Sequence, residues 1–193
     1  MMPDAGTVLL RIARATIARP LGVELAAPED ASWLAAAGAT FVTLKKNGEL
    51  RGCIGTLDAE RPLLVDLKSN AAAAAFRDPR FPPVTSSELD EIRIEVSLLS
   101  PLSPLSPVDF ESEDEAAARL RPFEDGVVLE HGRARATFLP QVWEDLSDPA
   151  RFLAELKRKA GLPPSFWAPD LRLFRYTVSK WSEPEPALAP VAT

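Results

Sequence analysis

The sequence predicts an α+β protein in which helices pack against sheets rich in antiparallel strands. Two runs read as β-hairpins, at residues 39–57 and 126–139, and they outnumber strand–helix–strand alternations. Apolar residues also recur at helical spacing in several separate segments. Nineteen prolines among 193 residues, about twice the usual share, predict rigid loops and sharply ended elements. We expect two intimately associated subdomains within one domain at 5–180.

The first element is a helix over residues 5–19. Its apolar residues form one stripe, and Arg11, Arg14 and Arg19 lie largely off that stripe. Pro20 ends the helix. Residues 21–40 are irregular, with one short helix near 32–37.

The next segment predicts a hairpin with strands at 39–46 and 49–57. Asn47-Gly48 lies between them and suits a two-residue turn in which both residues need positive φ. Side chains alternate across a strand, so we expect two faces in the second strand. One face would carry Arg51, Cys53 and Gly55, and the other would carry Gly52, Ile54 and Thr56.

A second helix is predicted from Pro62 to about residue 76, followed by a turn in which Thr85 and Glu88 form a capping box. The run at 92–99 alternates cleanly and predicts a strand. Glu95 lies on the polar side of that alternation.

The second half begins with the proline-rich segment 100–108, a candidate hinge that is either a linker between subdomains or a rigid surface strap. Ser112 and Glu115 suit a capping box, which predicts a short helix at 113–121. The second hairpin follows, with His131-Gly132 at its turn. The remaining expected elements are short helices at 140–146 and 149–160, a strand at 171–179 and a disordered tail at 183–193.

Composition excludes several classes of function. A net charge of −6 argues against nucleic-acid binding, which depends on neutralising phosphates. A single cysteine excludes an internal disulfide and suits a reducing compartment, so we expect a cytoplasmic protein. No apolar run predicts a signal peptide or a membrane helix. No Asp/Glu cluster recommends a metal site, and no cofactor is indicated.

The lone cysteine poses the main question about function. If Arg51 and Cys53 share a face, the guanidinium would favour the thiolate and make Cys53 a candidate catalytic nucleophile. Gly52 and Gly55 would let a ligand or another backbone approach closely. The alternative is that Cys53 is a buried small hydrophobic residue, as free cysteines often are.

Other residues have weaker claims to a site. Glu95 can orient Arg51 or accept a proton, or it can be an ordinary surface carboxylate. Asn70 can donate to a ligand or be satisfied within the interior. Arg80 lies in a proline-bounded loop, where binding residues are common. His131 is the only possible Cys–His base, but its place in a turn argues against that role.

Four blocks of the chain resemble the AMMECR family, whose bacterial and archaeal members are called AmmeMemoRadiSam system protein A. The blocks are "FVTLKKNGELRGCIGTL", "NAAAAAFRDPRFPPVTSSELDEIRIEVSLLSP", "ATFLPQVWEDL" and "FLAELKRKAGLP", and LRGCIG is the most specific part. The resemblance covers residues 5–180. The resemblance implies an α+β structure in two parts. The name AmmeMemoRadiSam implies a Memo-like protein and a radical SAM enzyme as partners.

The resemblance implies a site around Leu50–Gly55, with Asn70, Arg80 and Glu95 as the nearest candidates from the other blocks. Two hypotheses remain open. In the first, the protein is a ligand-binding or thiol-dependent component, in which arginine binds a small anionic ligand and Cys53 acts as nucleophile or transient carrier. In the second, it is a non-catalytic interaction domain in which LRGCIG is structural.

Overall fold

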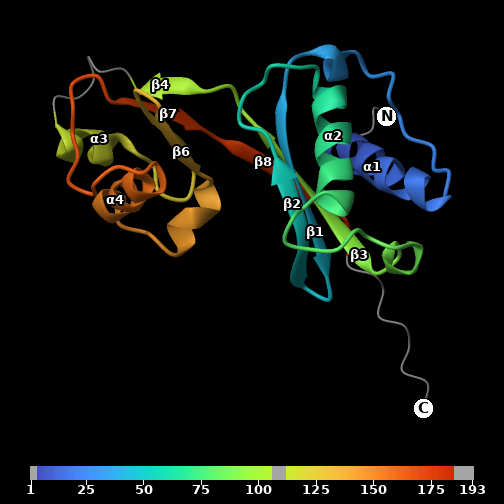
Figure 1. Cartoon of the computed structure of the whole chain (residues 1–193). Helices are drawn as coiled ribbons and strands as arrows, with labels where there is room; N and C mark the ends of the chain where they lie inside the picture. Colours follow the sequence, from blue (N-terminus) through green and yellow to red (C-terminus); the bar gives the residue numbers. More distant parts are fainter. Residues whose placement is uncertain (1–3, 106–111, 185–193) are drawn as a thin grey trace. The chain divides into compact units, whose positions relative to one another are not determined.

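The computed structural model describes residues 4–105 and 112–184. The described residues divide into two compact units, one formed by residues 4–99 with 179–184 and the other by residues 100–105 with 112–178. Each unit contains one four-stranded sheet with helices beside it (Figure 1). The predicted α+β class is therefore confirmed.

The first unit has a sheet with strand order β2-β1-β3-β8. Helices α1 and α2 lie together against one face of this sheet (Figure 1). We call the opposite face the helix-free face. The elements of this unit are α1 (Ala5–Ala18), η1 (Arg19–Leu21), η2 (Ser32–Ala35), β1 (Ala39–Lys46), β2 (Glu49–Gly55), α2 (Leu63–Phe76), η3 (Ser86–Glu88), β3 (Ile92–Leu99) and β8 (Val178–Ser182).

Local signals place these elements where the sequence predicts them. The hairpin turn has positive φ at Asn47 (53°) and Gly48 (81°), as its two-residue length requires. Thr85 and Glu88 form the predicted capping box. The core between helices and sheet is built from aliphatic side chains with essentially no exposure, including Leu9, Ile12, Val42, Leu44, Leu67, Ile94 and Val96.

The second unit has the strand order β4-β7-β5-β6. Its elements are β4 (Ser103–Leu105), α3 (Glu113–Arg119), β5 (Gly126–His131), β6 (Ala134–Phe138), η5 (Pro140–Glu144), α4 (Pro149–Lys159) and β7 (Arg172–Tyr176). Asp148 caps α4 through the Arg151 amide at 2.7 Å, as predicted. Trp143 stacks on Phe152 within a separate apolar core.

Two predicted elements of the second half differ in the structure. Residues 103–105 form an edge strand paired with β7, although they were expected to be a linker or strap. The single strand expected at 171–179 is two strands, β7 and β8, which belong to different sheets. The break falls at Thr177, whose backbone exchanges hydrogen bonds with Ser100 instead of a strand neighbour.

The ordered structure extends one residue or more beyond the point where the sequence predicts a disordered C-terminal tail. Glu183, assigned above to the tail, binds Arg14 and the Ile94 amide, so it belongs to the first unit. The rest of the predicted tail, residues 185–193, lies outside the described residues, as do 106–108 of the candidate hinge. Among the described helices, none combines the length and apolarity needed to cross a bilayer.

Candidate functional site around Cys53

A β-bulge in β2 separates Arg51 from Cys53. Thr43 pairs with Cys53 and Leu44 with Gly52, but Lys45 pairs with Leu50, so Arg51 is an extra residue without a cross-strand partner. The Arg51 side chain binds Glu88, which also binds Lys46. Since Lys46 and Thr43 are three residues apart in β1, they point to opposite faces. The prediction that Arg51, Cys53 and Gly55 share one face is therefore wrong for Arg51.

The Arg51 guanidinium is held in a mostly buried ion cluster. Its Nε and Nη2 atoms donate to Glu88 at 3.0 and 3.1 Å, and its side chain is 11% exposed. Lys46 adds a further bond at 3.3 Å. Hydrogen bonding from Arg51 outweighs burial and lowers the pKa of Glu88 to about 2. Arg51 therefore anchors the hairpin to η3 and is not directed at the thiol.

Replacing Glu88 by glutamine should remove a pH-dependent part of the stability. The pKa of Glu88 is lowered from 4.5 to about 2, so its stabilisation is complete above pH 4.5 and is lost as the pH falls toward 2. Near neutral pH we expect the free energy of unfolding to drop by about 1–3 kcal/mol in Glu88→Gln. Urea denaturation across this pH range should show the gap between the two proteins closing. A gap that stays constant with pH would contradict the assignment, and exposed Glu49→Gln serves as the control.

Other parts of the protein occupy the space beside the two motif glycines, Gly52 and Gly55. A Cβ on Gly52 would lie 2.2 Å from the carbonyl oxygen of Ala74 in α2. A Cβ on Gly55 would lie 2.2 Å from the Phe41 ring. The close backbone approach expected from the sequence is thus made by α2 at Gly52, and by an aromatic side chain at Gly55.

Cys53 presents its thiol on the helix-free face. Its Sγ lies 3.3 Å from the Thr43 hydroxyl, and the residue is half-buried, so the sulfur is not sealed in the core. Thr43 and Cys53 are directly opposite in neighbouring strands. The Cys53 amide and carbonyl are directed away from β1. Thr43 and Cys53 therefore form a non-hydrogen-bonded pair, the kind in which cross-strand side chains lie closest.

The backbone of Cys53 is clamped by the loop after α2. Its amide donates to Asp78 Oδ2 at 2.9 Å, and its carbonyl accepts from Arg80 Nη2 at 3.1 Å. Asp78 and Arg80 also pair with each other at 2.7 Å. The clamp satisfies the Cys53 amide and carbonyl on the free edge of β2, which is the outermost strand of the sheet.

Arg80 is a cation held beside Cys53 through the Cys53 carbonyl. Hydrogen bonding to Asp78 is the main cause that raises the pKa of Arg80, and a charge on Cys53 contributes in the same direction. The Arg80 hydrogen bonds, led by its side chain, hold the pKa of the Asp78 carboxyl well below its usual range despite burial. About half of the Arg80 side chain remains exposed, so its guanidinium can still meet a ligand.

Glu95 lies on the helix-free face in the same row as Thr43 and Cys53. Thr43 pairs with Cys53 on one side and with Glu95 on the other, so two strand spacings, about 10 Å, separate Glu95 from Cys53. Lys45 and Lys180 bind its carboxylate at 3.0 and 2.9 Å. Burial alone would raise the pKa of Glu95, but these hydrogen bonds outweigh it and leave the pKa lowered.

Asn70 faces the interior instead of the helix-free face. It is buried, and its amide nitrogen donates to Thr40 and to Asp66 Oδ2 at 2.9 Å. Asp66 has no exposure and accepts hydrogen bonds from Thr40, Thr56, Arg61 and Asn70. This network ties α2 to β1 and to the end of the motif strand. Sequence reasoning missed Asp66, whose only signal was an acidic residue in the first turn of a helix.

His131 makes its contacts inside the second unit. Its Nε2 lies 3.3 Å from Asp170, and its ring packs edge-on against Phe166 at 4.7 Å. It ends β5, one residue before Gly132, whose φ is 57°. Within residues 4–105 and 112–184, no cluster of three His, Cys, Asp or Glu side chains could hold a metal ion.

These features define an α+β protein of two sheet-based units, with a cysteine strand clamped at the edge of the first sheet. A sequence model described as AMMECR1 matches residues 10–181. The chain belongs to the AMMECR1 family.

Individual relatives match over almost the whole chain. A protein of Methanothermobacter thermautotrophicus is 40% identical over 93% of this chain and 95% of its own length. Protein MJ0810 of Methanocaldococcus jannaschii is 36% identical over 95% and 92%. The crystal structure of uncharacterized protein PH0010 from Pyrococcus horikoshii has a TM-score of 0.77 and 34% identity, covering 92% of this chain and 91% of that chain.

Proposed function

We propose that the protein is a thiol-dependent, ligand-binding component that works with a Memo-like protein and a radical SAM enzyme. Its site lies on the helix-free face and is centred on Cys53. The observation that carries the proposal is a half-buried thiol held beside the Thr43 hydroxyl, on a peptide unit fixed by Asp78 and Arg80. The two partners are inferred from the resemblance of the four sequence blocks to the family.

The charges around this site suit a small anionic ligand. Arg80, Lys45 and Lys180 supply three cations, and Asp78 and Glu95 supply two carboxylates, which leaves one net positive charge. The three cationic side chains are between about one third and one half exposed. An anion can therefore reach them without breaking the buried ion pairs of Asp78 and Glu95.

The thiol should react in the native protein. We expect iodoacetamide to label wild-type protein without denaturant because Cys53 is half-buried and is the sole cysteine. Labelling followed by intact mass should be absent in Cys53→Ser, which should keep the melting temperature of the wild type. A thiol that stays unlabelled until urea is added would contradict a site at Cys53.

A second candidate is a non-catalytic interaction domain in which LRGCIG is structural. It is favoured by the structural partners of Arg51, Gly52 and Gly55, which are Glu88, Ala74 and Phe41. Co-purification with the Memo-like protein and the radical SAM enzyme, together with a cellular readout, separates the two. If Cys53→Ala keeps both, the domain acts as a scaffold. If it keeps binding and loses the cellular function, the thiol-dependent role is supported.

A further inference from the structure

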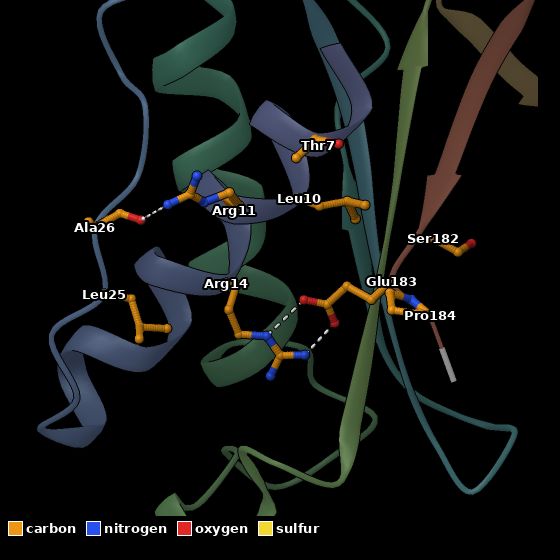
Figure 2. A pocket seen from close by; sticks show the side chains of 9 residues that line it. All are labelled: Thr7, Leu10, Arg11, Arg14, Leu25, Ala26, Ser182, Glu183 and Pro184. Atoms are coloured by element: carbon orange, nitrogen blue, oxygen red, sulfur yellow. Dashed lines mark hydrogen bonds and ion pairs between the residues drawn. The ribbon is translucent and has the colours of Figure 1, made fainter. Parts of the chain in front are cut away.

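A pocket lies beside α1, on the helix side of the first sheet, whereas Cys53 lies on the helix-free face. It has a volume of about 530 Å³ and lies between α1, the segment at 25–26 and the chain at 182–184. This size is within the range of small-molecule sites. Figure 2 shows Arg11 and Arg14 leaving the same helix toward different walls, Arg11 toward Ala26 and Arg14 toward Glu183.

The charge of Arg14 is already balanced inside the protein. Its Nε donates to Glu183 at 2.9 Å, and its terminal nitrogens donate to the carbonyls of Leu89 at 2.6 Å and Ile92 at 2.9 Å. Glu183 in turn accepts from the Ile94 amide. The Arg14–Glu183 ion pair therefore forms one wall of the pocket and contributes no net charge.

Arg11 has donors to spare. Its side chain is exposed and makes one hydrogen bond, from Nη2 to the Ala26 carbonyl at 3.2 Å. A guanidinium carries five N–H donors. No carboxylate among the described residues pairs with it, so Arg11 gives the pocket one net positive charge.

The rest of the lining is mainly apolar, with the hydroxyl residues Thr7 and Ser182 among it. Leu10, Leu25 and Pro184 line the pocket, and Leu25 is 43% exposed. The pocket therefore combines apolar side chains with one arginine that no carboxylate neutralises. It has an apolar part and an anion-binding part.

We infer that this pocket binds a small amphipathic monoanion, with its apolar body on Leu10 and Leu25 and its anionic group on Arg11. The site is separate from Cys53, because α1 lies on the helix face of the sheet and Cys53 lies on the helix-free face. The inference does not depend on the function proposed for Cys53.

The probe for this site is 8-anilinonaphthalene-1-sulfonate, an aromatic monoanion whose fluorescence rises in apolar surroundings. We expect saturable binding to the native protein at one site. Arg11→Gln should weaken binding about tenfold because a charge-assisted hydrogen bond is lost. Arg19→Gln is the matched control, since Arg19 leaves the same helical segment but lies outside the pocket and is 76% exposed. Equal affinity in the two variants, or no saturable binding, would overturn the inference.

A displacement experiment tests the two parts of the ligand separately. Octanoate should displace the probe, and octan-1-ol, with the same chain and no charge, should displace it far more weakly. In Arg11→Gln this preference should disappear. If the alcohol competes as well as the carboxylate in the wild type, the pocket is merely apolar and the inference is wrong. Cys53→Ser should bind the probe as the wild type does.

Discussion

Replacing Asp66 by alanine is expected to lower the free energy of unfolding by about 3–5 kcal/mol. Its carboxylate has no exposure and accepts five hydrogen bonds, two from Thr40 and one each from Thr56, Arg61 and Asn70. Removal leaves the buried amide and hydroxyl of Thr40 without this acceptor, which costs more than the bonds themselves contribute. Urea denaturation at neutral pH measures the loss.

Two further variants make the Asp66 result specific. Asp66→Asn keeps the shape and part of the acceptor capacity, so we expect a smaller loss. Glu60→Ala removes an exposed carboxylate six residues earlier and should change stability by less than about 0.5 kcal/mol. A loss below 1 kcal/mol in Asp66→Ala would mean that the network does not hold α2 to the sheet.

Gly52→Ala is expected to destabilise the protein by about 2–4 kcal/mol, because the added Cβ overpacks a contact with backbone. That Cβ would lie 2.2 Å from the Ala74 carbonyl oxygen, and a carbonyl within a helix cannot rotate away as a flexible side chain can. Either α2 or β2 must shift, and the core between them must open.

The control for Gly52 is the turn glycine of the same hairpin. Gly48 has φ 81° and nothing within 4 Å of a Cβ, so Gly48→Asn should cost under about 1 kcal/mol. Thermal unfolding of both variants compares a filled glycine position with an empty one. Equal melting temperatures for Gly52→Ala and the wild type would contradict the close approach of α2.

Signals that act within a few residues predicted their elements well. The Asn47-Gly48 turn, the Thr85–Glu88 box and the Asp148 cap each satisfy backbone groups two or three residues away, so sequence alone predicts them. The class of fold followed from the two hairpins, whose alternation was clear.

Features that depend on distant partners could not be read in the same way. The bulge at Arg51 arises from how β1 and β2 pair, and a strict alternation along β2 therefore placed Arg51 on the wrong face. The break at Thr177 depends on Ser100, 77 residues earlier. Asp66 finds most of its partners outside its own helix, so its sequence neighbours gave no sign of its role.

The candidate site shows the same division. Cys53 was found because it is the only cysteine, Glu95 because it lies on the polar side of its strand, and Arg80 because it lies in a proline-bounded loop. The Thr43 hydroxyl at 3.3 Å from its sulfur depends on strand register and was missed. Asn70, singled out as a possible ligand donor on the helix after the motif strand, lies within the Asp66 network, inside the protein.

The geometry places Arg80 beside Cys53, where it donates to the Cys53 carbonyl, whereas Arg51 is bound to Glu88. The most direct test of this placement is the rate of iodoacetamide alkylation of the native protein, as a function of pH, in wild type, Arg51→Gln and Arg80→Gln. Near-UV circular dichroism establishes that each variant is folded. We expect Arg80→Gln to slow alkylation by about threefold or more near neutral pH, while Arg51→Gln stays close to wild type. Slower alkylation in Arg51→Gln with an unchanged rate in Arg80→Gln would contradict the account.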